Sequence, residues 1–436
     1  MATKEKVLLA YSGGLDTSCI LAWLIEQGHE VVCFLADVGQ AEDFKEAERK
    51  ALAIGAKKMV VEDLKREFVD DLCFRAIQCN AIWEDRYLLG TSLARPVIAR
   101  AMMRVAKKES CTAVSHGCTG KGNDQVRFEL AYYAIQPSIN VIAPWRLPEF
   151  YNRFAGRNDL LDYASKHNIP VTSTKAKPWS MDENLAHCSY EAGILEEADV
   201  TPPDDMWKLT DDPRNAPNTP EDATIFFEKG LPVGVVLGSD PKAGNKITDS
   251  LELFTTLNEL GRKHGIGRID IVENRYIGLK SKSKHLSDKT KQNKTLTSFS
   301  DSPAMTILRL AHLDLEGLVL DREVRLLRDQ FVTITWSKIL YNGLYFSPER
   351  KFIEKSILAS QDDVNGQVRL RCYKGSVSVL GRSSETSKLY SPEQSSMDSL
   401  EDFQPTDTTG FIATQAIRLK AYGQAEATAG IDLCKS

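Results

Sequence analysis

The stretch VLLAYSGGLDTS, residues 7–18, decides the fold that we predict for the first part of this 436-residue chain. It starts as a short apolar run, turns at two adjacent glycines and continues into a segment with helical periodicity that Gly28 ends. A strand, a glycine turn and a helix form the first part of an α/β unit, and ligands of open α/β sheets bind where the strands end. We therefore expect a ligand at this turn.

The turn concentrates groups that bind anions. Its paired glycines let backbone N–H groups approach a phosphate closely, and the start of the following helix adds a partial positive charge. Ser12, Thr17 and Ser18 add hydroxyl donors. A capped turn would explain Ser12 alone, but not so many donors in one short loop. Neither G-x-x-x-x-G-K-[ST] nor G-x-G-x-x-G occurs in the chain, yet we interpret the turn as a phosphate loop that binds ATP.

Asp16 places a carboxylate in the same loop. A carboxylate beside phosphates is unfavourable unless a cation lies between them, so we expect Mg²⁺ to accompany the ATP. We expect no metal site made of protein ligands alone. The nine cysteines are scattered singly and no CxxC motif occurs, which also argues against a disulfide framework and redox chemistry.

Strand and helix signals alternate from this loop to about residue 170. Fully apolar strands separated by helices predict a parallel sheet that is covered on both faces. The expected strands lie at 7–10, 31–36, 58–61, 112–115 and 141–143, and the expected helices at 15–27, 41–54, 94–108 and 126–135.

Beyond residue 170 the pattern changes to Pro-rich polar connections, with strand-like pieces near 225 and 233–237 and helices near 250–264 and 321–330. We predict an α/β chain with a doubly wound parallel-sheet nucleotide-binding domain, a second, mixed α/β domain and a C-terminal helical arm. The predicted boundaries are 1–171, 172–403 and 404–436. The helix expected at 416–422 is too short to build a core, so we expect the arm to dock on a neighbouring subunit or domain.

Composition narrows the function classes. The net charge is −5 and the pI about 5.9, without the basic stripe that is typical of proteins that bind nucleic acid. No apolar run approaches the roughly 20 residues needed to span a bilayer. The first residues lack the apolar core of a signal peptide, so we expect a cytoplasmic protein with neither a nucleic-acid nor a membrane partner.

A second glycine-rich cluster, SHGCTGKGNDQVR at 115–127, again follows an expected strand and precedes an expected helix. Three glycines expose backbone donors, while Asn123, Asp124 and Arg127 supply an amide and both signs of charge. Helix capping would explain Asn123 or Asp124, but not the three glycines together with Lys121 and Arg127. We expect this loop to bind a small zwitterion with a carboxylate and an ammonium group.

Together the two loops resemble those of the argininosuccinate synthases, within the superfamily of PP-loop ATP pyrophosphatases. The resemblance extends through EDRYLLGTSLARP at 84–96, PWSMDENL at 178–185 and GRIDIVENR at 267–275. It implies ATP-dependent ligation of L-citrulline to L-aspartate through citrullyl-AMP, with release of AMP and pyrophosphate, in arginine biosynthesis and the urea cycle. It also implies a homotetramer.

The resemblance assigns residues to each ligand. For ATP they are Ala10, Tyr11, Ser12, Gly13, Gly14, Leu15, Asp16, Thr17, Ser18, Ala36, His116 and Gly117. For aspartate they are Thr119, Asn123 and Asp124, and for citrulline Tyr87, Ser92, Asn123, Arg127, Ser180, Ser189 and Glu273. Asp16, Asp124 and Arg127 are the expected catalytic residues. Taken singly, Tyr87 could serve core packing, Ser180 and Ser189 helix capping, and His116 either proton transfer or a turn.

Residues 281–300 depart from the family pattern, which has a tyrosine that contacts citrulline where this chain has Ser300. We expect a polar, disordered insertion and a citrulline pocket that lacks one wall; alternatively, the segment is translated intron. The departure keeps open a synthase-derived ATP-binding protein with impaired activity. Another PP-loop enzyme, such as a tRNA-thiolating one, is a further alternative that the acidic pI and the absence of CxxC oppose.

Overall fold

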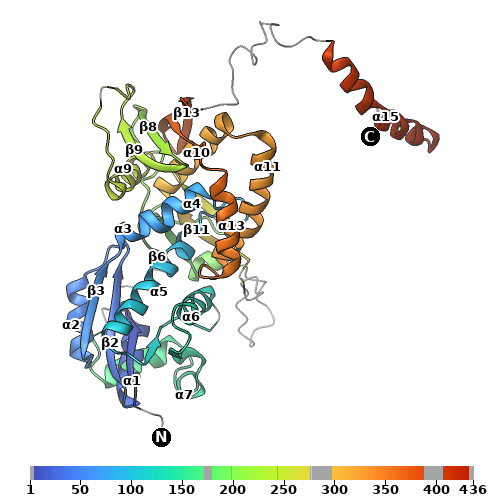
Figure 1. The fold of residues 1–436 in the computed structure, drawn as a ribbon. Helices are drawn as coiled ribbons and strands as arrows, with labels where there is room; N and C mark the ends of the chain where they lie inside the picture. Colours follow the sequence, from blue (N-terminus) through green and yellow to red (C-terminus); the bar gives the residue numbers. More distant parts are fainter. Residues whose placement is uncertain are drawn as a thin grey trace. The chain divides into compact units, whose positions relative to one another are not determined.

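The computed structural model describes residues 4–120, 122–170, 179–197, 199–242, 244–274, 276, 297–386 and 406–431. The chain divides into two compact units, 1–386 and 387–436, and Figure 1 shows their elements. Within the described residues, no helix is both long and apolar enough to cross a membrane.

A five-stranded parallel sheet organises the first part of the chain, as the sequence predicts. Its order is β3-β2-β1-β4-β5. The strands β2 and β3 are therefore added on one side of β1, and β4 and β5 on the other. The strands are β1 (Lys6–Ala10), β2 (Glu30–Asp37), β3 (Lys58–Asp63), β4 (Ala113–Ser115) and β5 (Asn140–Ile142).

Helices cover both faces of this sheet because successive side chains of a strand point in opposite directions. Val7 and Leu9 of β1 pack with the helices of one face, while Leu8 between them joins the core on the other. The first face carries α1 (Leu15–Glu26), α2 (Phe44–Ile54) and α8 (Arg157–Lys166), and the second α5 (Gly90–Lys108) and α6 (Asn123–Ile135). Shorter helices are α3 (Lys65–Phe68), α4 (Phe74–Gln78) and α7 (Pro148–Tyr151).

Two four-stranded antiparallel sheets follow. One has the order β10-β11-β7-β6, with β6 (Ser180–Glu183), β7 (Cys188–Glu191), β10 (Arg268–Val272) and β11 (Thr297–Asp301). The other has the order β13-β12-β8-β9, with β8 (Glu221–Glu228), β9 (Leu231–Leu237), β12 (Gly366–Tyr373) and β13 (Ser376–Ser383). The accompanying helices are α9 (Ser250–Lys263), α10 (Pro303–Val319), α11 (Arg322–Phe331), α12 (Ser337–Tyr341) and α13 (Pro348–Ala359).

The expectation of a polar loop over 281–300 is wrong at its end. Thr297–Asp301 forms β11, which pairs with both β10 and β7 in the middle of its sheet. Phe299 is buried against Trp207, and Ser300 is buried as well. Because few of these residues are apolar, the sequence pattern did not indicate a strand. Pairing with both neighbouring strands and the buried ring of Phe299 stabilise it. The rest of the expected insertion lies outside the described residues.

A buried polar network ties α10 to its neighbours. The carboxylate of Glu316 accepts hydrogen bonds from Arg328 Nη2 at 2.7 Å, Asn80 Nδ2 at 2.7 Å and Gln361 Nε2 at 2.9 Å. The amide oxygens of Asn80 and Gln361 face the two ring nitrogens of His312 at 2.8 and 2.9 Å. Five side chains from distant parts of the chain thus share one charged centre.

The second unit contains α15 (Asp407–Thr428), which is much longer than the helix expected at 416–422. Large apolar side chains lie exposed along it, including Phe411 at 66% and Ile417 at 69% of their full exposure.

Candidate functional site

The two glycine-rich loops meet at the carboxyl edge of the parallel sheet. They follow β1 and β4, which are neighbours in the sheet. Gly117 lies so close to α1 that a Cβ atom there would stand 2.8 Å from Cγ2 of Thr17. Segments that are about a hundred residues apart in the sequence therefore lie in contact.

The phosphate loop is held in shape by its own side chains. Gly13 adopts a positive φ of 72°, which favours glycine. Ser12 Oγ lies 3.1 Å from Thr17 Oγ1, and Tyr11 Oη lies 3.1 Å from Ser18 Oγ. The N-cap of α1 is Gly14, so no side chain caps the first N–H groups of the helix. Uncapped N–H groups at a helix start are suited to bind an anion.

Asp16 lies in the first turn of α1 and is half-buried. Burial raises the pKa of its carboxyl group, and the charge of Arg157 acts in the opposite direction. Among the described residues, no group of three or more histidine, cysteine or acidic side chains could hold a metal ion. A cation at this loop would therefore depend on oxygen ligands from the nucleotide in addition to Asp16.

Two further predicted ATP residues have partners of their own. The carbonyl of Ala36, at the end of β2, accepts a hydrogen bond from Gln40 Nε2 at 2.7 Å. His116 Nδ1 accepts one from the backbone N–H of Cys118 at 3.2 Å, and His116 Nε2 lies 3.0 Å from Glu129. Since Nδ1 accepts a hydrogen bond, the ring proton is on Nε2, which donates a hydrogen bond to the carboxylate of Glu129. This geometry favours His116 as a turn residue over a general base.

A cavity of about 230 Å³ lies next to the second glycine loop. All of the predicted substrate residues except Ser92 and Ser180 line it, namely Tyr87, Thr119, Asn123, Asp124, Arg127, Ser189 and Glu273. Ser180 is exposed on β6, whereas Ser92 is buried and its hydroxyl has no hydrogen-bond partner among the described residues.

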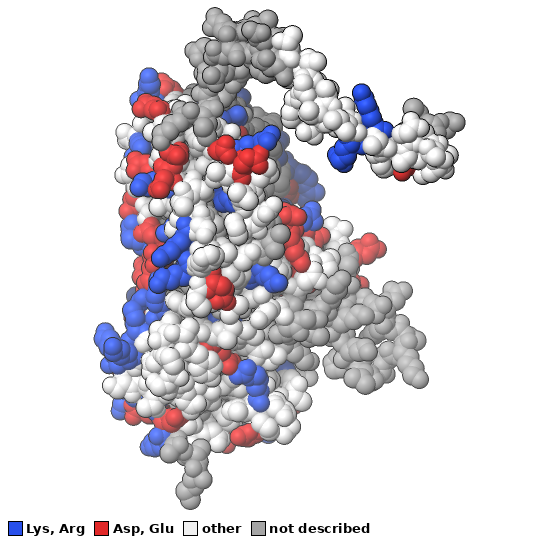
Figure 2. Space-filling model, turned by 45° about the vertical axis from the view of Figure 1, so that its right-hand side comes forward, with Lys and Arg blue, Asp and Glu red and all other residues white. Residues whose placement is uncertain are grey.

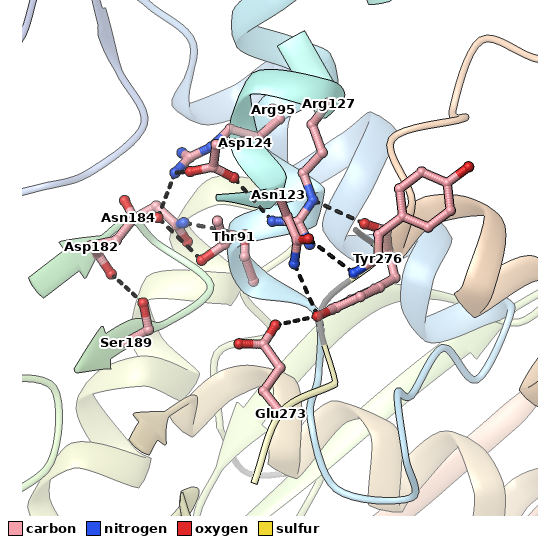
Figure 3. Close-up of polar contacts among 12 residues, drawn as sticks. Thr91, Arg95, Asn123, Asp124, Arg127, Asp182, Asn184, Ser189, Glu273 and Tyr276 are labelled. Carbon is pink, nitrogen blue, oxygen red and sulfur yellow. Dashed lines mark hydrogen bonds and ion pairs between the residues drawn. The ribbon is translucent and has the colours of Figure 1, made fainter. Parts of the chain in front are cut away.

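Asp124 is clamped between two guanidinium groups (Figure 3). Its carboxylate lies 2.7 Å from Arg95 Nη2 and 3.0 Å from Arg127 Nη1. Burial alone would raise the pKa of Asp124, but the two arginines outweigh it and hold that pKa far below its usual range. Within the described residues, Arg95 Nε and Arg127 Nη2 are buried without a partner. The site therefore keeps donors for an anionic group and a carboxylate that can face an ammonium group.

Tyr341, at the end of α12, joins three of the predicted substrate residues. Its hydroxyl donates to Glu273, Asn123 Nδ2 donates to it at 3.0 Å, and its backbone carbonyl accepts from Arg127 Nε at 2.9 Å. Trp83 stacks on its ring with centroids 4.1 Å apart. Sequence reasoning missed Tyr341, because nothing in the residues around it distinguishes it from a core tyrosine.

Sequence reasoning also missed Thr91, Arg95 and Asp182, which line the same cavity. Arg95 Nη2 lies 2.6 Å from Asp182, and Thr91 donates a hydrogen bond to that carboxylate at 3.1 Å. Thr91 and Arg95 stand on one side of α5, four residues apart, as do side chains on consecutive helical turns. This four-residue spacing on the helix that follows Tyr87 is the feature of the sequence that could have indicated Thr91 and Arg95.

Ser300 lies behind the cavity rather than in it. Its hydroxyl is 3.0 Å from His187 Nδ1, and His187 Nε2 is 3.0 Å from Thr91 Oγ1. Burial lowers the pKa of His187 to about 4, so the ring is neutral at pH 7. Ser298, two residues earlier on β11 and therefore on the same face of the strand, does line the cavity.

Charge on the surface is mixed. On the face shown in Figure 2, basic and acidic side chains are interspersed.

Comparison with known proteins gives matches over nearly the whole chain. A family model described as the arginosuccinate synthase N-terminal HUP domain matches residues 6–170, and one described as the arginosuccinate synthase C-terminal domain matches 179–422. The chain is 58% identical over 433 residues to an argininosuccinate synthase of Saccharomyces cerevisiae, covering 99% of both chains. It is 52% identical over 422 residues to one of Homo sapiens, covering 97% of this chain and 98% of the other.

Proposed function

Since this chain belongs to the argininosuccinate synthase family, we propose that the cavity beside Asp124 holds its two amino-acid substrates and that the phosphate loop holds ATP. The protein is an ATP-dependent ligase that joins L-citrulline to L-aspartate in arginine biosynthesis. The matches do not favour a tRNA-thiolating enzyme or a non-catalytic ATP-binding protein.

The reaction has two steps. The ureido oxygen of citrulline attacks the α-phosphorus of ATP, the bond between the α- and β-phosphates breaks, and pyrophosphate leaves. The amine of aspartate then attacks the ureido carbon, AMP departs with the oxygen, and the nitrogen loses a proton. Because adenylation supplies the leaving group, the protein must mainly position the reactants and stabilise charge.

The single observation that carries the site assignment is the clamp on Asp124 by Arg95 and Arg127. We assign the free Nη2 of Arg127 to the citrulline carboxylate and Glu273 to the citrulline ammonium group. Asp124 faces the ammonium group of aspartate, with Thr119 and Asn123 beside it. The uncapped start of α1 would bind the phosphates. Mg²⁺ would enter with ATP, with Asp16 as the protein's contribution, and would neutralise phosphate charge.

An assay of pyrophosphate release with each substrate omitted in turn tests this function. We expect exchange of labelled pyrophosphate into ATP to need citrulline but not aspartate, and argininosuccinate to form only with all three substrates. Pyrophosphate release that is independent of citrulline would contradict the assignment.

We further propose a cytoplasmic homotetramer that α15 holds together. Phe411, Ile412, Ile417, Leu419 and Tyr422 are all more than half exposed on this helix. Most helical stability in proteins comes from packing of an apolar face, and a second copy would cover this one. Sedimentation of a chain cut after Thr409 should give a smaller assembly; an unchanged assembly would refute the role of the arm.

A further inference from the structure

A second cavity, of about 360 Å³, lies apart from the substrate cavity and shares no lining residue with it. It is bounded by the first residues of β10, one side of α10 and the turn between β12 and β13. Its walls are mainly apolar, with Leu88, Ile269, Leu310, Leu313 and Val377 among them. This volume is typical of sites for small molecules and is too small for a folded chain segment.

Three arginines also line this cavity. Arg86 Nη1 donates to the backbone carbonyl of Asp270 at 3.0 Å, and Arg268 Nε donates to Thr210 Oγ1 at 2.8 Å. Arg309 differs from both, because its Nε is buried and has no hydrogen-bond partner among the described residues. Nor does any acidic side chain in the described part of the chain form an ion pair with it.

A buried guanidinium N–H group that has no hydrogen-bond partner is energetically unfavourable, and apolar walls around it supply none. Burial lowers the pKa of Arg309, and Glu316, Asp329 and Asp85 counteract it only through their more distant charges. Glu316 is already engaged by Arg328. An anion placed at Arg309 would remove this cost, and the apolar walls would accept the rest of the molecule.

We propose that this cavity is a binding site for a small amphiphilic carboxylate, with the carboxylate at Arg309 and the hydrocarbon part against α10 and β13. A bare inorganic anion would leave the apolar walls uncovered, and a neutral apolar molecule would leave Arg309 unpaired. The proposal does not depend on catalysis, because the cavity is separate from the substrate residues.

Octanoate is the probe for the full-length protein, and octan-1-ol is its uncharged match. We expect calorimetry to show saturable binding of octanoate, with octan-1-ol at least about tenfold weaker because it lacks the charge-assisted hydrogen bond. Arg309→Met should weaken octanoate binding by about tenfold or more, and Leu313→Trp should abolish it by filling the cavity. Arg322→Met is the matched control, because that arginine is exposed on α11, away from the cavity.

Each other outcome decides against the site. Equal binding of octanoate to the Arg309→Met variant would show that the carboxylate lies elsewhere. Retained binding to the Leu313→Trp variant would place the whole ligand elsewhere. No saturable binding to the wild-type protein would also overturn the proposal, including the case in which a second copy covers the cavity. Thermal unfolding of each variant in the absence of ligand shows whether it is folded, and the proposal is tested on the variants that are.

Discussion

The phosphate loop and the proposed substrate cavity lie close together in the sheet architecture, but they are built in different ways. The loop is contiguous, and it offers mainly backbone groups whose geometry depends on Gly13 and on the start of α1. The cavity is lined by side chains from α5, α6, β6, β7, β10, β11 and the loops between them. Tyr341 of α12 forms hydrogen bonds with three of the lining residues. A substitution in the loop should therefore affect the binding of ATP alone, whereas a substitution in the cavity should affect the binding of both amino-acid substrates.

Asp124→Asn should have the largest effect. It keeps the size of the side chain but removes the charge that pairs with Arg95 and Arg127, and each such contact contributes about 1.5–3 kcal/mol. We expect kcat/KM for argininosuccinate formation to fall by about 100-fold or more. Steady-state kinetics with aspartate and citrulline varied separately measures it.

Asp71→Asn is the control, because it breaks an aspartate–arginine pair of similar length with Arg100, away from the cavity. Since Asp124 also orients Arg127, citrulline-dependent pyrophosphate exchange should fall too. If exchange stays normal while transfer to aspartate fails, Asp124 serves aspartate alone and the cavity is less coupled than its contacts indicate.

Tyr341→Phe should have an intermediate effect. It removes the hydroxyl that bonds Glu273 and Asn123 but keeps the stack on Trp83 and the carbonyl that holds Arg127. We expect KM for citrulline to rise by about tenfold, as for the loss of one or two hydrogen bonds, with KM for ATP unchanged. Tyr345→Phe is the matched control, a buried tyrosine of the same segment. Equal shifts in both variants would assign the effect to packing.

Gly117→Ala should have the smallest effect and should act on the nucleotide. The added methyl group would stand 2.8 Å from Thr17 Cγ2, so the side chain of Thr17 must move. We expect KM for ATP to rise by about threefold to tenfold and KM for citrulline to stay constant. Gly120→Ala in the same loop meets nothing closer than 3.5 Å and should be neutral. A change in citrulline KM alone would show that the two loops do not act separately.

The same contrast explains what the sequence could predict. The five strands of the parallel sheet and the helices α1, α2, α5 and α6 follow from apolar runs and glycine turns, which are local signals, although α2 starts later and α5 and α6 start earlier than predicted. The sequence analysis did not predict α8, which also covers the sheet. Asn123, Asp124 and Arg127 could be placed because the glycines mark their loop. Arg95 had only the weak signal of its helical spacing from Thr91, and Asp182 and Tyr341 had none, because their importance depends on partners up to about 200 residues away. The strand Thr297–Asp301 was not predicted for the same reason, because it is formed by pairing with β10 and β7, which are distant in the sequence.

The network around Glu316 makes the free energy of unfolding of the protein depend on pH. Burial opposes ionisation of this carboxyl group, but His312 and Arg328 outweigh burial and lower its pKa. Its contribution to the free energy of unfolding is therefore complete above the pKa of an unfolded glutamate, about 4.3, and is lost as the pH falls through the lower folded value. Asn80, Arg328 and Gln361 depend on the same charge, so acid should release α10, α11 and the residues after α13 in one step.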